Sequence, residues 1–366
     1  MKILIDDGMQ IQIGTGIGKY SWHLYQSLKK CTDINVDLAE FDKRELSKIS
    51  GRLAYLKYIN SDEYLKMSEQ YDVIHYTNYA MPFRKNNKSK YIVTIHDLVS
   101  FLYPETLPFS YRYYSKLTIL HSLYSADVIF TDSYSVRKEI INKWPQYEIK
   151  VFVGYPGFYT EFKQLNLSNV KYENQKIFSV ENKKFFLFVG TIEKRKNVGI
   201  LIEAFLNLRK NRMLNNYKLV LAGRAGYGFE HFQSIVKDAK AQNEIIFTGY
   251  ISDNDCAKLY REAAAYIFPS VYEGFGSTQL ECMANKLPLI CSNIPTNKEI
   301  SGEYGMFFEL KDVNSLICQM KNVIEKNYNE IEMQKTGFNI LNRFQWETLI
   351  NQYIEKYQYT IDKVKL

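Results

Sequence analysis

The sequence predicts an α/β protein built from two parallel-sheet domains, and three observations lead to that prediction. The chain has 366 residues, more than one hydrophobic core usually serves. Short apolar runs alternate with helical patterns in two separate series, which is typical of parallel strands covered by helices on both faces. Between the series, residues 157–184 lose this periodicity and are rich in Asn, Ser, Glu and Lys, which marks a connection between domains.

The first series begins with an apolar strand, a glycine-containing loop and a helical pattern at Tyr20, Leu24 and Leu28. Each later strand of the series ends in polar residues. Its expected strands are Lys2–Ile5, Val73–Tyr76, Tyr91–Ile95 and Asp127–Phe130, and a further helix is expected at Tyr111–Tyr124.

The second series follows the connecting residues and shows the same alternation of strands and helices. Its expected strands are Phe185–Val189, Lys218–Ala222, Ile245–Phe247, Ala265–Phe268 and Pro288–Cys291, with helices at Val198–Arg209 and Ala257–Ala264. The last stretch, Trp346–Tyr359, has the pattern of an amphipathic helix. We therefore predict two facing Rossmann-like domains, 1–165 and 180–345, with the helix of residues 346–366 crossing back to the first domain.

Composition excludes several classes of protein. Hydrophobic residues make up 46% and charged residues 24%, as in globular proteins, so long disorder is not expected. No apolar run is long enough to span a membrane, and the apolar residues at the N-terminus are too few for a signal peptide, so we expect a cytoplasmic protein. The five cysteines are widely spaced and form no C-x-x-C pair, so we expect neither disulfides nor a zinc site.

The net charge of +7 suits an acidic partner such as nucleotide phosphates, lipid head groups or nucleic acid. Its sign alone does not choose among them. The basic residues form no concentrated patch in the sequence, which disfavours nucleic acid. The 30 tyrosines suit surfaces that bind sugars or membrane interfaces, although the base composition of the genome would explain them as well.

The strongest local signal is the segment 268–281, FPSVYEGFGSTQLE, in which a strand end, a glycine turn and a helix start follow one another. Glycines in the turn let a ligand approach the backbone, and the first amides of a helix favour an anion. The candidate donor-binding residues here are Gly274, Phe275, Gly276, Ser277 and Thr278.

Two carboxylates flank this turn. Glu273 lies in the loop, and Glu281 lies about one turn into the following helix. Because carboxylates accept hydrogen bonds from vicinal hydroxyls, one of these acids can bind the hydroxyls of a sugar and the other those of a ribose. The alternative is that Glu281 only complements the helix dipole while Glu273 is solvated.

A pair of cations, Arg195 and Lys196, lies where the strand Phe185–Val189 turns into a helix after Gly190 and Thr191. Paired cations at such a position can neutralise a departing diphosphate. Most exposed Arg-Lys pairs are simply solvated, and it is the position after a strand that favours the functional interpretation.

The glycines of Gly14-Thr15-Gly16-Ile17-Gly18 follow the first strand and can form a phosphate or substrate loop, or a plain tight loop. Their spacing differs from the G-x-G-x-x-G of dinucleotide-binding folds. No acidic residue ends an obvious second strand, since Asp33 and Asp37 are expected to lie in or beyond a polar turn. An oxidoreductase is therefore disfavoured.

His96 and Asp97 follow the strand Tyr91–Ile95, so they should emerge at the carboxyl edge of a parallel sheet, where ligands bind. The other four histidines fall within a strand or within helical patterns, where packing or exposure is the simpler explanation. His96 can also be a structural histidine. Arg112 and Lys116, with Tyr111–Tyr114, form a basic aromatic face that can meet a lipid-linked acceptor or can be ordinary surface.

These residues carry a resemblance to glycosyltransferase family 4, the retaining enzymes of GT-B fold. The E-x7-E pattern with its EGFG turn resembles the nucleotide-binding signature of that family. The segments 188–197, 219–224 and 246–252 are similar to its strand ends in the second domain. Residues 14–18 and His96-Asp97 match landmarks of its first domain. The resemblance covers most of the chain, most strongly residues 185–310.

The resemblance implies roles for the candidate residues. Arg195 and Lys196 would stabilise the diphosphate, Glu273 would hold donor-sugar hydroxyls, Glu281 the ribose, and His96 would lie beside the transferred sugar. The other implied donor contacts are Gly16 and Gly18 of the first domain, Gly190 and Thr191, and the backbone of Gly249, Tyr250 and Ile251 around the base.

The chain departs from the family at two places. Thr191 stands where many relatives carry an arginine, so Arg195 or Arg224 would supply that charge. Ser277-Thr278-Gln279 replaces a segment that contains Leu-Pro in relatives, so donor preference does not carry over directly. No metal and no cofactor are expected, since cations take the place of a metal.

The expected function is retaining transfer of a sugar, mannose or rhamnose as the first choice, from a GDP-, dTDP- or UDP-linked donor. The acceptor would be a glycan or a lipid-linked oligosaccharide in bacterial O-antigen, lipopolysaccharide or capsule biosynthesis, with peripheral contact to the inner membrane and no nucleic acid. The alternatives are a GT-B sugar-nucleotide epimerase or phosphorylase, and a non-catalytic sugar-binding partner subunit, against which the retained cations and carboxylates argue.

Overall fold

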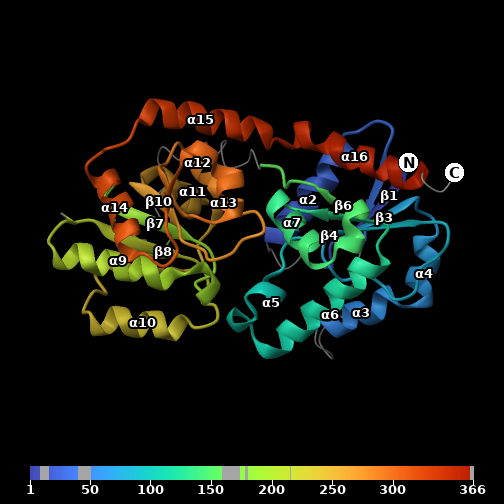
Figure 1. Ribbon diagram of the computed structural model, residues 1–366, viewed down its shortest axis with the longest axis horizontal. Coiled ribbons are helices and arrows are strands. Elements are labelled where there is room, and N and C mark those ends of the chain that lie inside the picture. Colours follow the sequence, from blue (N-terminus) through green and yellow to red (C-terminus); the bar gives the residue numbers. More distant parts are fainter. Residues whose placement is uncertain (9–15, 40–50, 159–173, 178–179, 215, 363–366) are drawn as a thin grey trace. The chain divides into compact units, whose positions relative to one another are not determined.

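The computed structural model describes residues 1–8, 16–39, 51–158, 174–177, 180–214 and 216–362. The chain divides into two compact units, each with its own sheet (Figure 1). Unit 1 comprises Met1–Leu102, Phe109–Gly157 and Phe344–Leu366, and unit 2 comprises Tyr103–Pro108 and Phe158–Arg343.

Unit 1 contains a parallel six-stranded sheet in the order β2-β1-β3-β4-β5-β6. The chain order reverses at β1, because β2 lies on one side of β1 and β3 on the other. The strands are β1 Lys2–Asp6, β2 Asn35–Leu38, β3 Val73–Tyr76, β4 Lys90–Ile95, β5 Val128–Thr131 and β6 Val151–Val153.

Both faces of this sheet are buried, as the continuous apolar strands predict. Successive residues point to opposite faces, so Leu4 packs in one core while Ile3 and Ile5 pack in the other. The helices of unit 1 are α2 Gly16–Lys29, α3 Gly51–Ile59, α4 Asp62–Ser68, α5 Val99–Leu102, α6 Phe109–Ser125, α7 Tyr134–Lys143 and α16 Trp346–Asp362.

Unit 2 contains a second parallel six-stranded sheet, in the order β12-β11-β10-β7-β8-β9. The strands are β7 Phe185–Val189, β8 Lys218–Ala222, β9 Ile245–Gly249, β10 Ala265–Phe268, β11 Leu289–Ser292 and β12 Gly305–Phe308. Its helices are α9 Val198–Lys210, α10 Phe229–Asp238, α11 Asp253–Glu262, α12 Thr278–Ala284, α13 Pro295–Ser301, α14 Val313–Ile324 and α15 Glu330–Arg343.

The predicted α/β class with two parallel sheets is confirmed, and so is the return of the last helix to the first domain. Helix α16 packs on α2 and buries Trp346, Tyr353 and Tyr357 against the unit 1 sheet. Among the described residues, no helix combines the length and the apolar character needed to cross a membrane.

Three of the four edge strands, β2, β6 and β12, were not predicted; each has three or four residues. Asp37, expected in or beyond a polar turn, belongs to β2 and accepts a hydrogen bond from the Tyr71 hydroxyl at 2.9 Å. Short edge strands bury less apolar surface than central ones, which leaves a weaker pattern in the sequence.

The tyrosines of α16 enter a buried polar network of unit 1. The Tyr357 hydroxyl lies 2.7 Å from His75 Nδ1, and His75 Nε2 lies 2.8 Å from the Thr94 hydroxyl. The Tyr353 hydroxyl donates to the Gly154 carbonyl at 2.7 Å. Burial, with a smaller effect of His96, lowers the pKa of His75 to about 3, so this ring is neutral and needs both partners.

We expect Tyr357→Phe to lower the free energy of unfolding of unit 1 by about 1–3 kcal/mol, because it leaves a buried ring nitrogen without its partner. The three tryptophans, Trp22, Trp144 and Trp346, all lie in unit 1, so tryptophan fluorescence during urea denaturation reports on this unit alone. The control is Tyr124→Phe, at a side chain that is 78% exposed. Equal destabilisation by the two variants would contradict a structural role for the Tyr357 hydroxyl.

Candidate active site

The candidate site of unit 2 lies where the order of its strands reverses. From β7 the chain runs through β8 and β9 to one edge of the sheet, and then returns to β10 on the other side of β7. In open parallel sheets, ligands bind outside the carboxyl ends of the strands at such a reversal. The segments after β7 and β10 carry Arg195, Lys196 and Glu273, so the structure brings the three predicted residues together at this point.

Arg195 and Lys196 both bind the Glu273 carboxylate. Lys196 Nζ lies 2.6 Å from Oε1, and Arg195 Nη1 lies 3.2 Å from Oε2. Arg195 also donates to the Tyr272 carbonyl at 3.1 Å and pairs with Glu193 at 3.0 Å. The two cationic side chains are only 17% and 16% exposed, so they point into the protein and not into bulk water.

The charge state of Glu273 follows from this arrangement. Burial by itself would raise the pKa of this carboxyl, but the charges of Lys196 and Arg195 outweigh it and lower the pKa to about 2. Glu273 is therefore ionised at neutral pH. Such a carboxylate can accept hydrogen bonds from hydroxyls, but it has no proton to donate.

A buried polar network behind the loop fixes Glu273, and sequence reasoning missed it. The Thr296 hydroxyl donates to the Glu273 carbonyl at 2.8 Å. Gln279 Nε2 donates to Asn297 Oδ1 at 3.1 Å, and Asn297 in turn donates to the Ser292 carbonyl at 3.0 Å. The sequence feature that could have indicated it is the largely polar segment Pro295–Ser301, which begins three residues after the end of β11, the neighbour of β10.

The turn of residues 274–278 is closely packed. Gly276 has φ +83°, and a Cβ there would lie 2.5 Å from Gln279 Nε2, so this position requires glycine. Gly274 and Phe275 are buried, while Ser277 precedes α12 and Thr278 begins it. The Thr278 hydroxyl accepts from Tyr266 at 2.8 Å. Glu281 is buried. It lies in the first turn of α12, close to the position predicted for it.

The loops after β7 and β8 are tied together. Ile192 donates to the Arg224 carbonyl at 2.9 Å, and Gly226 donates back to the Ile192 carbonyl at 3.0 Å. Gly223 has φ +149°, and a Cβ there would lie 1.9 Å from the Gly190 carbonyl oxygen. Only glycine permits this approach of the two strand ends.

The remaining donor candidates of unit 2 line the same edge of the sheet but are more open. Thr191, Arg224 and Tyr250 are exposed, and the Arg224 guanidinium lies over the Tyr250 ring at 4.9 Å. Gly249 ends β9, followed by Tyr250 and the half-buried Ile251. A cavity of about 980 Å³ runs beside β9 and α10, and Gly249 is part of its lining.

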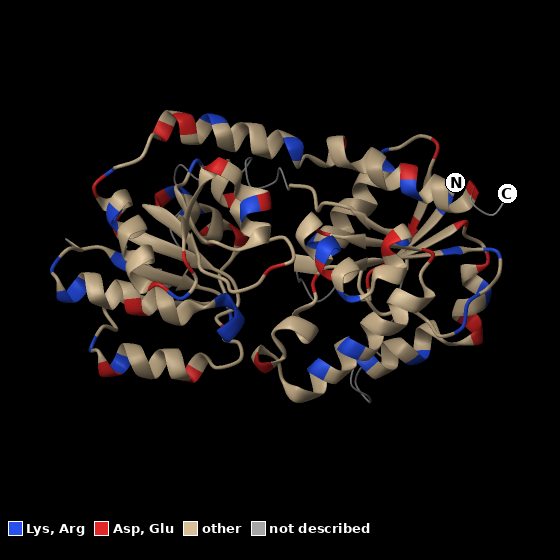
Figure 2. Cartoon of the chain, viewed as in Figure 1, with Lys and Arg blue, Asp and Glu red and all other residues tan. Residues whose placement is uncertain are grey.

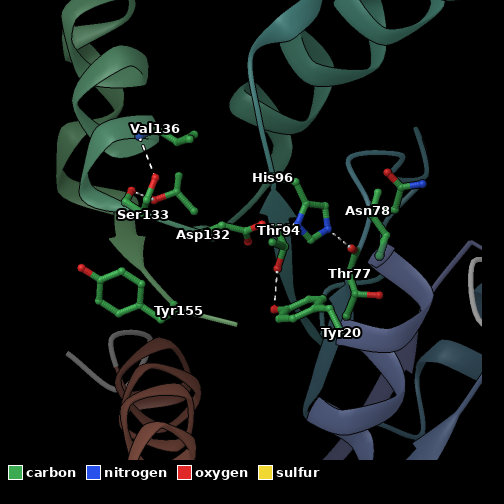
Figure 3. A network of polar contacts seen from close by, with 12 residues as sticks. Tyr20, Thr77, Asn78, Thr94, His96, Asp132, Ser133, Val136 and Tyr155 are labelled. Carbon is green, nitrogen blue, oxygen red and sulfur yellow. Dashed lines mark hydrogen bonds and ion pairs between the residues drawn. The ribbon is translucent and has the colours of Figure 1, made fainter. Parts of the chain in front are cut away.

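In unit 1, His96 joins the ends of three neighbouring strands (Figure 3). Its Nδ1 lies 2.7 Å from Asp132 Oδ2, after β5, and its Nε2 lies 2.7 Å from the Thr77 carbonyl, after β3. Tyr20 of α2 packs edge-on against the ring, with ring centroids 5.2 Å apart. The Ser133 hydroxyl accepts from the Val136 amide and caps α7, which fixes the turn that carries Asp132.

Both ring nitrogens of His96 face acceptors. A carbonyl accepts only, so Nε2 carries a proton, and one further proton lies between Nδ1 and Asp132. Burial lowers the pKa of His96, but the Asp132 charge and the hydrogen bonds outweigh it, and the pKa is raised overall. Burial also raises the pKa of Asp132, against the opposing effect of His96. The pair therefore holds its proton more tightly than the unfolded chain does.

The other candidate residues of unit 1 have contacts and positions different from those of His96 and Asp132. The Asp97 carboxylate accepts from the Val99 amide at 3.1 Å, at the start of α5. Arg112 lies half-buried on α6. Gly16 is exposed at the start of α2 and Gly18 is buried within it, whereas Gly14 and Thr15 lie outside the described residues. Asp132 and Thr77 were not predicted, because their link to His96 depends on strand order.

Comparison with known proteins indicates the enzyme class. Residues 170–339 match the family described as glycosyl transferases group 1. The chain is a glycosyltransferase. It is 25% identical over 370 residues to the O-antigen chain mannosyltransferase B of Escherichia coli, covering 94% of this chain and 96% of that protein. It is 27% identical over 248 residues to the O-antigen chain mannosyltransferase RfbU of Salmonella typhimurium, covering 68% and 63%.

Solved structures show that the glycosyltransferase has the GT-B fold. Sucrose-phosphate synthase from Thermosynechococcus elongatus superposes with a TM-score of 0.71 at 17% identity, covering 99% of this chain and all of that one. HepE from Anabaena in complex with UDP gives a TM-score of 0.71 at 16% identity and covers 98% of this chain. The predicted resemblance is confirmed at the level of fold and enzyme class.

We expect Asp132→Asn to lower the pKa of His96, because the variant removes the negative charge that opposes burial. The chain has only five histidines, so NMR titration of their ring protons can follow His96 directly. Since the folded pKa of His96 is raised, its contribution to stability is present below about pH 6.5 and is lost as the pH rises through the folded value. The free energy of unfolding of unit 1 should fall with rising pH in the wild type, and less so in Asp132→Asn. Identical pH profiles for the two proteins would show that the pair does not hold the proton.

Proposed function

We propose that the glycosyltransferase takes its sugar from a nucleotide-diphosphate donor bound by unit 2, with mannose as the first choice of sugar. The observation that carries the proposal is the cluster of Arg195, Lys196 and Glu273 at the reversal of strand order. It places two cations and one ionised carboxylate where ligands bind in sheets of this kind.

The proposed roles follow from charge. Arg195 and Lys196 contact the diphosphate and stabilise the charge that develops as it leaves. Glu273, held ionised by the same cations, accepts hydrogen bonds from hydroxyls of the donor sugar. Glu281 binds the ribose, and the backbone of Gly249, Tyr250 and Ile251 binds the base. The amides at Gly276–Thr278 add to the diphosphate site, and His96 lies beside the transferred sugar.

We also propose that the configuration at the anomeric carbon is retained and that no metal takes part. Among the described residues, no group of three or more His, Cys, Asp or Glu side chains is arranged to hold a metal ion. In the proposed mechanism the two cations carry out the charge stabilisation that a metal performs elsewhere. Undiminished turnover in the presence of a chelator is the expected result.

The relatives support the choice of sugar and pathway. The two bacterial relatives are named as O-antigen chain mannosyltransferases, which favours a mannosyl donor and a glycan or lipid-linked oligosaccharide acceptor in polysaccharide biosynthesis. HepE was solved with UDP, so UDP-sugars stand beside GDP- and dTDP-sugars as donors to be compared. With a lipid-linked acceptor, we place the enzyme at the cytoplasmic face of the membrane as a peripheral protein.

Replacing Lys196 by Ala should lower kcat by about 100-fold or more, because it removes a cation that stabilises the leaving diphosphate. Lys194 supplies the matched control: it lies in the same short turn, but its ammonium is exposed over the Tyr227 ring. Turnover of the cognate donor would be measured for Lys196→Ala and Lys194→Ala. The site assignment is refuted if Lys196→Ala retains the turnover of the wild type.

The cognate nucleotide should raise the thermal midpoint of unfolding, since it binds the folded state alone. A screen of UDP, GDP and dTDP identifies it, and donor hydrolysis with the stabilising nucleotide then identifies the sugar. Glu281→Ala should reduce the stabilisation by nucleotide, because the ribose loses a hydrogen-bond acceptor. If none of the three nucleotides shifts the midpoint, the proposal of a nucleotide site in unit 2 is wrong.

A further inference from the structure

Helix α6 of unit 1 presents a row of large apolar side chains to solvent. We call Phe109, Tyr113, Leu117, Leu120 and Tyr124 the apolar stripe; their exposed fractions are 71%, 52%, 68%, 40% and 78%. Spacings of three and four residues place all five on one side of a helix with 3.6 residues per turn. The opposite side of α6 buries Ile119 and Leu123 in the core, so the stripe is not needed for the packing of unit 1.

Two segments near α6 also expose apolar side chains. Phe83 is 68% exposed, and its ring lies 4.5 Å from the ring of His121 on α6. On α3, Leu53 is 58% exposed, but the guanidinium of its neighbour Arg52 lies 4.5 Å from the centre of the Tyr111 ring, on the other side of α6 from the stripe. An exposed row of large apolar side chains along one helix is typical of an interaction site.

The charged residues within the helices α3, α5 and α6 have one sign. Helices α3, α5 and α6 contain four cationic residues and no Asp or Glu, as the colours of α3 and α6 in Figure 2 illustrate. The cations are Arg52, Lys57, Arg112 and Lys116. Two more cations lie at the C-terminal end of α6, where Lys85 donates to the Ser125 carbonyl at 2.7 Å and Lys150 to the Tyr124 carbonyl at 3.1 Å. Burial lowers the pKa of Lys150, and the negative charge of Asp127 opposes this effect.

We infer that this face of unit 1 docks on an anionic lipid bilayer. Aromatic and aliphatic side chains on one side of a helix, bordered by Lys and Arg, fit the boundary between head groups and acyl chains. The cations match the negative potential of an anionic leaflet. The inference rests on the proposed peripheral membrane location and deepens it, since it assigns the contact to named residues and to the chemistry of the lipid.

The test is co-sedimentation of the full chain with lipid vesicles. The wild type should bind vesicles of phosphatidylglycerol and phosphatidylcholine more strongly than vesicles of phosphatidylcholine alone, and added salt should weaken the binding. The variant Phe109→Ser/Tyr113→Ser/Leu117→Ser should bind at least tenfold more weakly. Leu117→Glu, a single change at an exposed position, should also weaken binding and serves as a second variant if the triple variant folds poorly.

The matched control is Ile331→Ser/Phe338→Ser on α15, which removes two exposed apolar side chains, 83% and 61% exposed, from unit 2. It should bind vesicles as the wild type does. Stabilisation by nucleotide, measured in the same proteins, should be unchanged by the α6 variants, so failure of membrane docking can be told apart from failure of the proposed donor site.

Three outcomes would overturn the inference. Absence of wild-type binding to anionic vesicles is one, and equal binding by the wild type and Leu117→Glu is another. The third is a self-associating wild type that becomes monomeric in Leu117→Glu with no change in vesicle binding, which would assign the stripe to a second copy of the chain.

Discussion

One buried carboxylate, that of Glu273, organises the candidate site of unit 2. It binds two cations from the turn after β7, while its own loop follows the neighbouring strand β10. A carboxylate that is 8% exposed is stable as an anion only when it is paired, and two partially buried cations are stable only for the same reason. Each of the three groups therefore fixes the other two, and the two turns are held together by this shared requirement.

The same cluster sets the properties of the site before any donor arrives. Thr296 holds the Glu273 backbone, and the Tyr272 carbonyl accepts from Arg195, so both side chains and main chain are fixed. In the proposed mechanism, binding a diphosphate then exchanges hydrogen-bond partners among groups that are already in place. Preorganised donors of this kind stabilise developing charge without the cost of reorienting during the reaction.

Much of the fold and part of the site could be predicted from the sequence. Central strands such as β7 and β10 are buried on both faces, so their apolar runs stand out and their bounds were predicted to the residue. The polar residues that follow them, Lys196 and Glu273, could be selected because the carboxyl edge of a parallel sheet is where ligands bind. Their direct contact could not be predicted, because it depends on β10 lying beside β7 rather than beside β9.

The partners of His96 show the same limit more strongly. Asp132 follows Thr131 in a turn that has no unusual sequence feature, and Thr77 contributes only a carbonyl, which every residue possesses. Both become partners of His96 because β3, β4 and β5 are adjacent. Similarly, Gln279 and Asn297 are ordinary polar residues in the sequence, and only the packing of α12 on α13 places them in one buried network.

Each of the two polar clusters, considered by itself, limits the proton chemistry available to the proposed reaction. Glu273 is ionised and has no proton to give, and both ring nitrogens of His96 are engaged within unit 1. Neither group is therefore arranged as a general acid for the leaving group. A nucleoside diphosphate has little need of one, because its charge is already spread over phosphate oxygens and can be stabilised by cations alone. Two fixed cations beside an anionic hydrogen-bond acceptor suit stabilisation of a leaving diphosphate better than they suit acid catalysis.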